Sequence, residues 1–139
     1  MAIKYTIDQA RGLVRGHAFG VLTSEQLRDQ YARLMADPSL RHDYRQLVDL
    51  REVTEVEVDE GELRAAATMY LFDAGIRRAF VASGDAAYRF AIRFASRARE
   101  TGQFIQVFRS IEDAEAWLEI GAPPESRRPA PGPQRNTPG

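Results

Sequence analysis

The sequence contains no cysteine, which removes disulfide bonds, thiolate metal ligands and cysteine nucleophiles together. It has only two histidines, His17 and His42, and their separation matches no metal-ligand spacing, so we expect no metal site. It also lacks a P-loop and a Gly-x-Gly-x-x-Gly motif. No nucleophile–base or acid–base pair can be picked out, and we therefore expect no catalytic residue, no cofactor and no enzymatic activity.

An excess of charge of either sign is also lacking. The 19 Lys and Arg residues are balanced by 20 Asp and Glu residues, which leaves no overall field to hold nucleic acid or an anionic membrane. No apolar run approaches the about 18 residues of a membrane-spanning helix. Residues 1–8 do not show the basic and then apolar pattern of a signal peptide. We expect a soluble, cytoplasmic protein.

A composition shift divides the chain. Six of its seven prolines fall in residues 122–139, where large apolar side chains are almost absent. Such a segment buries too little surface to offset the entropy of ordering it. We predict a folded domain over residues 1–121 and a disordered, Pro- and Arg-rich tail over residues 122–139. Whether the tail is an interaction arm or a terminal extension without a role stays open.

The folded part shows strand and helix patterns in alternation. Residues 3–7 alternate apolar and polar side chains, and with residues 13–22 they predict a β-hairpin. Capping and periodicity then predict helices, and short apolar runs predict strands. The strands expected are 45–50, 79–82 and 104–108, and the helices 24–36, 59–71, 85–101 and 111–120. Ser83 is expected to cap the third helix.

The resulting order is β-β-α-β-α-β-α-β-α. It predicts an α/β domain with a single mixed, mostly parallel five-stranded sheet and helices packed on it.

Three short strings and the hairpin resemble the SpoIIAA-like proteins, which share the fold of STAS domains. The strings are Gln-Leu-Val-Asp-Leu-Arg at residues 46–51, Arg-Ala-Phe-Val-Ala at 78–82 and Ile-Glu-Asp-Ala-Glu-Ala-Trp-Leu at 111–118. The resemblance covers residues 3–120. It implies a STAS-like fold and a regulatory, protein-binding function.

One turn departs from that family pattern. In anti-sigma factor antagonists, the loop after the Asp-Leu strand carries a serine that a partner kinase phosphorylates. Here Asp59, Glu60 and Gly61 replace the family's Asp-Ser-Ser-Gly, and no hydroxyl occupies the turn. The resemblance therefore implies a non-enzymatic interaction module that lacks the phosphorylatable serine. The two acids would instead present negative charge permanently.

Two charge clusters give the candidate partner-binding residues. Residues 52–62 hold six acids and no base, whereas Arg77, Arg78 and Arg99 accompany a row of arginines in the third predicted helix. Like charges one helical turn apart repel unless an anionic group answers them. That group can be an acid of the same chain, of a second copy or of another protein. The candidates are Asp59, Glu60, Arg89, Arg93 and Arg97.

Aromatic residues on two predicted helices support an alternative function. The fold is related to that of Sec14-type lipid carriers, in which helices over the sheet part to hold an apolar ligand. Tyr70, Tyr88 and Phe94 are the candidate pocket residues for such a small apolar ligand. Aromatic side chains at helical spacing are otherwise part of a hydrophobic core.

Overall fold

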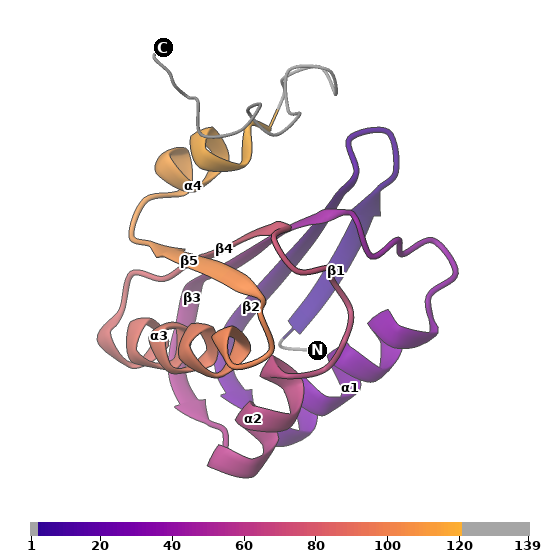
Figure 1. The fold of residues 1–139 in the computed structure, drawn as a ribbon. Coiled ribbons are helices and arrows are strands. Elements are labelled where there is room, and N and C mark those ends of the chain that lie inside the picture. The colour runs from indigo at the N-terminus through magenta and orange to yellow at the C-terminus, as the bar shows by residue number, and fades with distance from the viewer. Residues whose placement is uncertain (1–2, 121–139) are drawn as a thin grey trace.

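The computed structural model describes residues 3–120, which form one mixed β-sheet with four helices (Figure 1). In chain order the elements are β1 (Ile3–Asp8), β2 (Leu13–Thr23), α1 (Ser24–Ala36), β3 (Arg45–Glu57), α2 (Glu60–Ala67), β4 (Arg77–Val81), α3 (Asp85–Arg99), β5 (Phe104–Phe108) and α4 (Ile111–Leu118). The strands lie in the order β1-β2-β3-β4-β5. β1 is antiparallel to β2, and all other neighbours are parallel. The predicted fold class is confirmed.

The helices are divided unequally between the two faces of the sheet. α1, α2 and α3 cover one face, and α4 lies on the other (Figure 1). The larger core lies under the three helices, where α3 buries Phe90 and Phe94 against Phe80 of β4. A smaller core under α4 consists of Leu13, Leu47, Ala79, Val81, Ala114 and Leu118.

Local sequence explains where α1 begins. The Thr23 hydroxyl accepts a hydrogen bond from the Gln26 amide, and the Gln26 side chain accepts one from the Thr23 amide, both at 3.2 Å. This reciprocal capping satisfies two N–H groups that the first helical turn leaves without partners. Leu27, Tyr31 and Leu34 then recur at helical spacing and are buried. The predicted helix is confirmed.

β3 is longer than predicted. The strand expected over residues 45–50 continues to Glu57, because residues 51–57 also pair with β2. The register between β2 and β3 shifts twice along this pairing. These irregularities let Val53 and Val56 both face the larger core, although strict alternation would place them on opposite faces.

α2 is shorter than predicted, and Ser83 is not a cap. α2 ends at Ala67, where the Thr68 hydroxyl donates to the Arg64 carbonyl at 2.8 Å. α3 has Gly84 as its N-cap residue and no side-chain cap, because the helix begins at Asp85, one residue later than a Ser83 cap requires; the Ser83 carbonyl accepts from Arg109 at 2.8 Å. The predicted tail, residues 122–139, lies outside the described residues.

Phe94 makes the central contact of the larger core, with ring centroids 5.1 Å from Phe80 and 5.8 Å from Phe90. We expect Phe94→Ala to lower the free energy of unfolding by about 3–5 kcal/mol, because it leaves a cavity that the sheet cannot close. Urea denaturation measures this. Met35→Ala, on the exposed face of α1, is the control and should change stability by less than about 0.5 kcal/mol. Equal losses in both variants would contradict this account of the core.

Candidate functional site

The starts of α1 and α2 are joined through Asp59. Its carboxylate caps α2 by accepting from the Glu62 amide at 2.7 Å, and its own amide donates to the Ser24 hydroxyl at 2.9 Å. The Ser24 hydroxyl in turn donates to the Asp59 carboxylate at 3.2 Å. The sequence shows no hydroxyl in this turn, yet the fold brings Ser24 to it. Only the parallel pairing of β2 and β3, which both lead into helices, could have indicated this contact.

Glu60 connects α2 to α3. Its carboxylate accepts from Arg97 at 2.9 Å and also from Arg93, one helical turn earlier. Hydrogen bonds from Arg93 and then Arg97 lower the pKa of Glu60 below its usual range. Arg97 donates as well to Glu100 at 2.9 Å. Two arginines of the same chain therefore pair with the negative charge of Glu60. This corrects the expectation that the turn presents its negative charge unpaired.

Arg89 is the first of three arginines, with Arg93 and Arg97, that lie one turn apart on α3. It is exposed and has no hydrogen-bond or ion-pair partner within residues 3–120. The structure thus brings Glu60, Arg93 and Arg97 together, with Asp59 beside Glu60 in the chain. We call these five residues the α2–α3 charged face.

The aromatic residues predicted to form a pocket do not meet. Tyr70 is 60% exposed, stacks on His42 at 4.6 Å and donates to Asp73 at 2.6 Å. The Tyr88 ring lies 3.7 Å from the Arg109 guanidinium. Phe94 alone of the three lines the apolar cavity between α1 and the sheet. The predicted pocket is corrected accordingly, because α2 ends before Tyr70 and leaves it on a surface loop.

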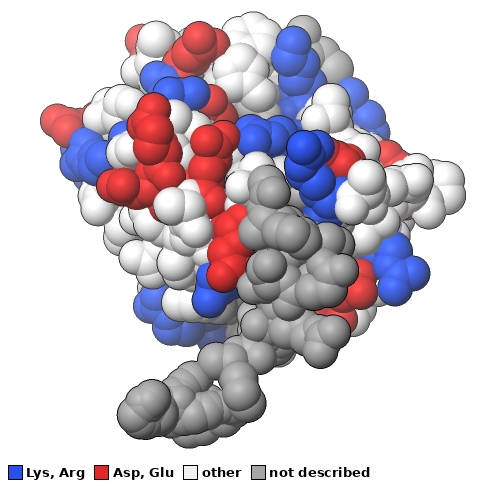
Figure 2. Space-filling view, turned by 90° about the horizontal axis from the view of Figure 1, so that it is seen from above, with Lys and Arg blue, Asp and Glu red and all other residues white. Residues whose placement is uncertain are grey.

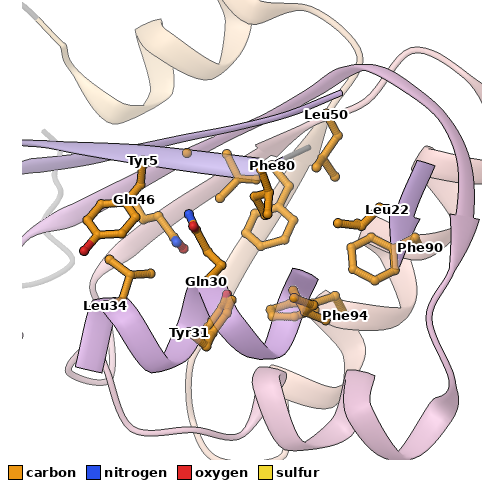
Figure 3. A pocket seen from close by; sticks show the side chains of 14 residues that line it. Tyr5, Leu22, Gln30, Tyr31, Leu34, Gln46, Leu50, Phe80, Phe90 and Phe94 are labelled. Carbon is orange, nitrogen blue, oxygen red and sulfur yellow. The ribbon is translucent and has the colours of Figure 1, made fainter. Parts of the chain in front are cut away.

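The cavity lies between α1 and the sheet (Figure 3). Its volume is about 20 Å³, and its lining is mostly apolar, with Gln30 and Gln46 among the exceptions. A space of this size holds about one water molecule. A drug-sized ligand needs about 300 Å³ or more, so this geometry does not favour an apolar-ligand carrier.

A buried arginine lies next to this cavity. Arg78 is 2% exposed, donates to the Gln46 side chain at 2.9 Å and also to Gln103, and packs over the Phe72 ring at 4.6 Å. Burial lowers the pKa of Arg78. In the sequence Arg78 belongs to the arginine cluster, but it lies two residues before Phe80 on β4 and therefore faces the same side of the sheet as that core residue.

Gln30 reaches from α1 toward Gln46 at the cavity (Figure 3). It is 3% exposed, and its side-chain oxygen has no partner within the described part of the chain. A buried amide oxygen without a donor costs free energy, so this atom weakens the packing of α1 on the sheet.

Other kinds of site find no support in residues 3–120. That part of the chain holds no group of three or more His, Cys, Asp or Glu residues placed to bind a metal. Each of its helices is too short or too polar to cross a bilayer. On the face that carries α4, acidic and basic side chains lie side by side, so neither sign covers that face alone (Figure 2).

The solved structures that resemble this one include the following two. One is an uncharacterised protein with a SpoIIAA-like fold from Shewanella loihica PV-4, with a TM-score of 0.56 and 17% identity over 84% of this chain and 94% of that chain. The chain has a SpoIIAA-like fold. The other is an anti-sigma factor antagonist from Mycobacterium paratuberculosis, with a TM-score of 0.57 and 16% identity over the same shares of the two chains. No protein-family model and no curated protein matches the chain.

These likenesses confirm the resemblance inferred from residues 46–51, 78–82 and 111–118 at the level of the SpoIIAA-like fold. At 17% identity or less they show the fold alone, because one fold carries unrelated activities.

The contacts of Glu60 predict how its carboxyl titrates. We expect its NMR-detected pKa to lie below the usual value for glutamate, because two guanidinium groups stabilise the ionised form. A lowered pKa contributes stability above the unfolded-state pKa and loses it as the pH falls through the folded-state pKa. In the Arg93→Gln/Arg97→Gln variant the pKa should return toward its usual value. An unchanged pKa in that variant would contradict the pairing.

The unpartnered Gln30 oxygen predicts a stabilising substitution. We expect Gln30→Met to raise the free energy of unfolding by about 1 kcal/mol, because it removes a buried acceptor and partly fills the cavity. Gln46→Met is the matched control, and it should be destabilising because Arg78 then loses an acceptor. Urea denaturation of both variants tests this pair, and the same sign of change in both would refute it.

Proposed function

We propose that this chain is a non-enzymatic, regulatory protein-interaction module of the cytoplasm whose partner docks on the α2–α3 charged face. The single observation that carries the proposal is the incomplete pairing of that face. Glu60 forms ion pairs with Arg93 and Arg97, whereas Arg89 forms no ion pair with a carboxylate within residues 3–120. The anti-sigma factor antagonist that shares the fold supports a protein as the partner.

The contacts indicate what the partner must supply. A carboxylate of the partner opposite Arg89 would pair with it as Glu60 pairs with Arg93 and Arg97. The planar guanidinium would fix the orientation of that carboxylate through paired hydrogen bonds. The ion pairs of Glu60 are exposed, and such pairs contribute little to stability. A partner acid can therefore compete with Glu60 for Arg93 at low cost. An acidic segment of another protein fits this face.

Site-specific photo-crosslinking tests the proposal. A benzoylphenylalanine replaces Ser96, an exposed residue one turn after Arg93 on α3, in one variant and Met35, an exposed residue near the C-terminal end of α1, in the control, so that Arg89 stays intact in both. We expect irradiation of the native cells to attach the same protein at position 96 in repeated experiments and not at position 35. The purified pair then provides a binding assay, in which Arg89→Glu should weaken binding at least about tenfold.

Two results would contradict the proposal. One is the absence of a protein attached specifically at position 96. The other is an attached protein whose affinity for Arg89→Glu equals that for the wild type, since the charge of Arg89 would then not recognise it. Met35→Glu should bind as the wild type does in the same assay.

A further inference from the structure

We propose that two copies of this chain associate through β5, whose free edges pair antiparallel, while one side of α3 packs against the same side of α3 in the second copy. This inference does not rest on the proposed function. It concerns a different side of α3 from the one that carries Arg93 and Arg97. It follows from the unpaired edge, the exposed apolar residues beside it and the charges at the two ends of α3.

The free edge of β5 carries no protection from residues 3–120. Among these residues β5 is the last strand of the sheet and pairs only with β4, and its other edge lies between α3 and α4 (Figure 1). Phe104–Phe108 reads Phe-Ile-Gln-Val-Phe, with no charge, proline or glycine. Folded proteins protect exposed strand edges with charges, prolines or bulges, because a free edge is a template for another strand.

The opposite edge of the sheet shows the contrast. β1 carries Lys4 and Asp8, and its Tyr5 hydroxyl donates to Asp37, just beyond the end of α1, at 2.8 Å. These charges and this contact deter a further strand from pairing with β1. β5 has no comparable device within the described part of the chain, so of the two edges it is the one suited to pairing.

Antiparallel pairing centred on Gln106 fits the aromatic residues on the α4 side. Phe104 is 43% exposed and contacts Trp117 edge-on, with ring centroids 5.6 Å apart. Phe108 contacts the same indole at 5.6 Å. The twofold axis would place Phe104 of each copy opposite Phe108 of the other, and such cross-strand aromatic pairs are stabilising. The exposed part of Phe104 would then be covered.

On the other side of the sheet, α3 offers a second apolar contact. Arg93 and Arg97 bind Glu60 and so mark the side of α3 that faces α2. At 100° per residue, Tyr88 and Ile92 lie on the opposite side. Tyr88 contacts Arg109, which follows β5, so this side faces the β5 edge. Ile92 on it is 45% exposed.

The charges at the ends of α3 are complementary under the same twofold axis. Asp85 in the first turn and Arg99 in the last turn lie equally far from Ile92 along the chain, and neither has an ion-pair partner within residues 3–120. α3 runs antiparallel to β5, so the axis that pairs the strands also sets the two α3 helices antiparallel. Asp85 of each copy then approaches Arg99 of the other, with Ile92 near the axis. The interface is self-complementary, as a twofold dimer requires.

A charge exchange tests this geometry in the full chain by sedimentation equilibrium over a wide concentration range. We expect a reversible dimer for the wild type. Asp85→Arg and Arg99→Asp should each raise the dimer dissociation constant at least about tenfold, because like charges then face each other across the axis. The double variant restores opposite charges and should recover most of the affinity. Asp29→Arg, an exposed change on α1, is the matched control and should leave the dimer unchanged.

A second variant tests the strand edge directly. Gln106→Lys places two lysines next to each other at the axis and should leave the protein monomeric, with an unchanged circular dichroism spectrum. A wild type that is monomeric at every concentration would overturn the proposal. So would a dimer that tolerates both Gln106→Lys and Ile92→Lys, or a double charge exchange that fails to restore association.

Discussion

Each parallel pair from β2 to β5 needs a helix to bring the chain back to the start of the next strand, and strands are added in one direction only. Crossovers of one hand therefore place α1, α2 and α3 on the same face of the sheet. On the other face α4 packs alone, and it covers only the smaller core around Leu13 and Leu47. The rest of that face remains polar, with an ion pair between Arg15 and Glu115 at 3.1 Å and a side-chain contact between His17 and Glu52 at 3.0 Å.

The same connectivity assembles the α2–α3 charged face. Each helix begins just after a parallel strand ends, so the helix N-termini lie together at the end of the sheet where the parallel strands terminate. This places Asp59 beside Ser24 at the starts of α1 and α2. α3 packs alongside α2, which brings Arg93 and Arg97 to Glu60. Glu60, which lies at the positive end of the α2 dipole, is thus also the acid that pairs with both arginines.

The sequence allowed correct predictions where a feature depends on residues close together in the chain. The capping pair of Thr23 and Gln26 lies within one turn, and it fixed the start of α1 correctly. The helical spacing of Tyr70 and Leu71 suggested a longer α2, but the segment after Ala67 is a loop, which a contact distant in sequence holds: the Asp73 amide donates to the His42 carbonyl at 2.8 Å. Arg78 was misplaced for a similar reason, since its burial depends on acceptors from β3 and from Gln103.

α3 carries two surfaces, and its packing keeps them apart. Phe90 and Phe94 anchor the helix in the larger core, so it cannot rotate to exchange one side for the other. In the proposed dimer, Arg93 and Arg97 would therefore stay on the side that faces α2, while Ile92 would lie near the twofold axis. A dimer joined at β5 would extend one sheet across both copies and display both α2–α3 charged faces on the same side of it. A partner with two acidic segments could bind both copies at once. Its second segment would then bind within the same complex, at a high effective concentration, so the overall affinity would exceed that of one segment for one copy.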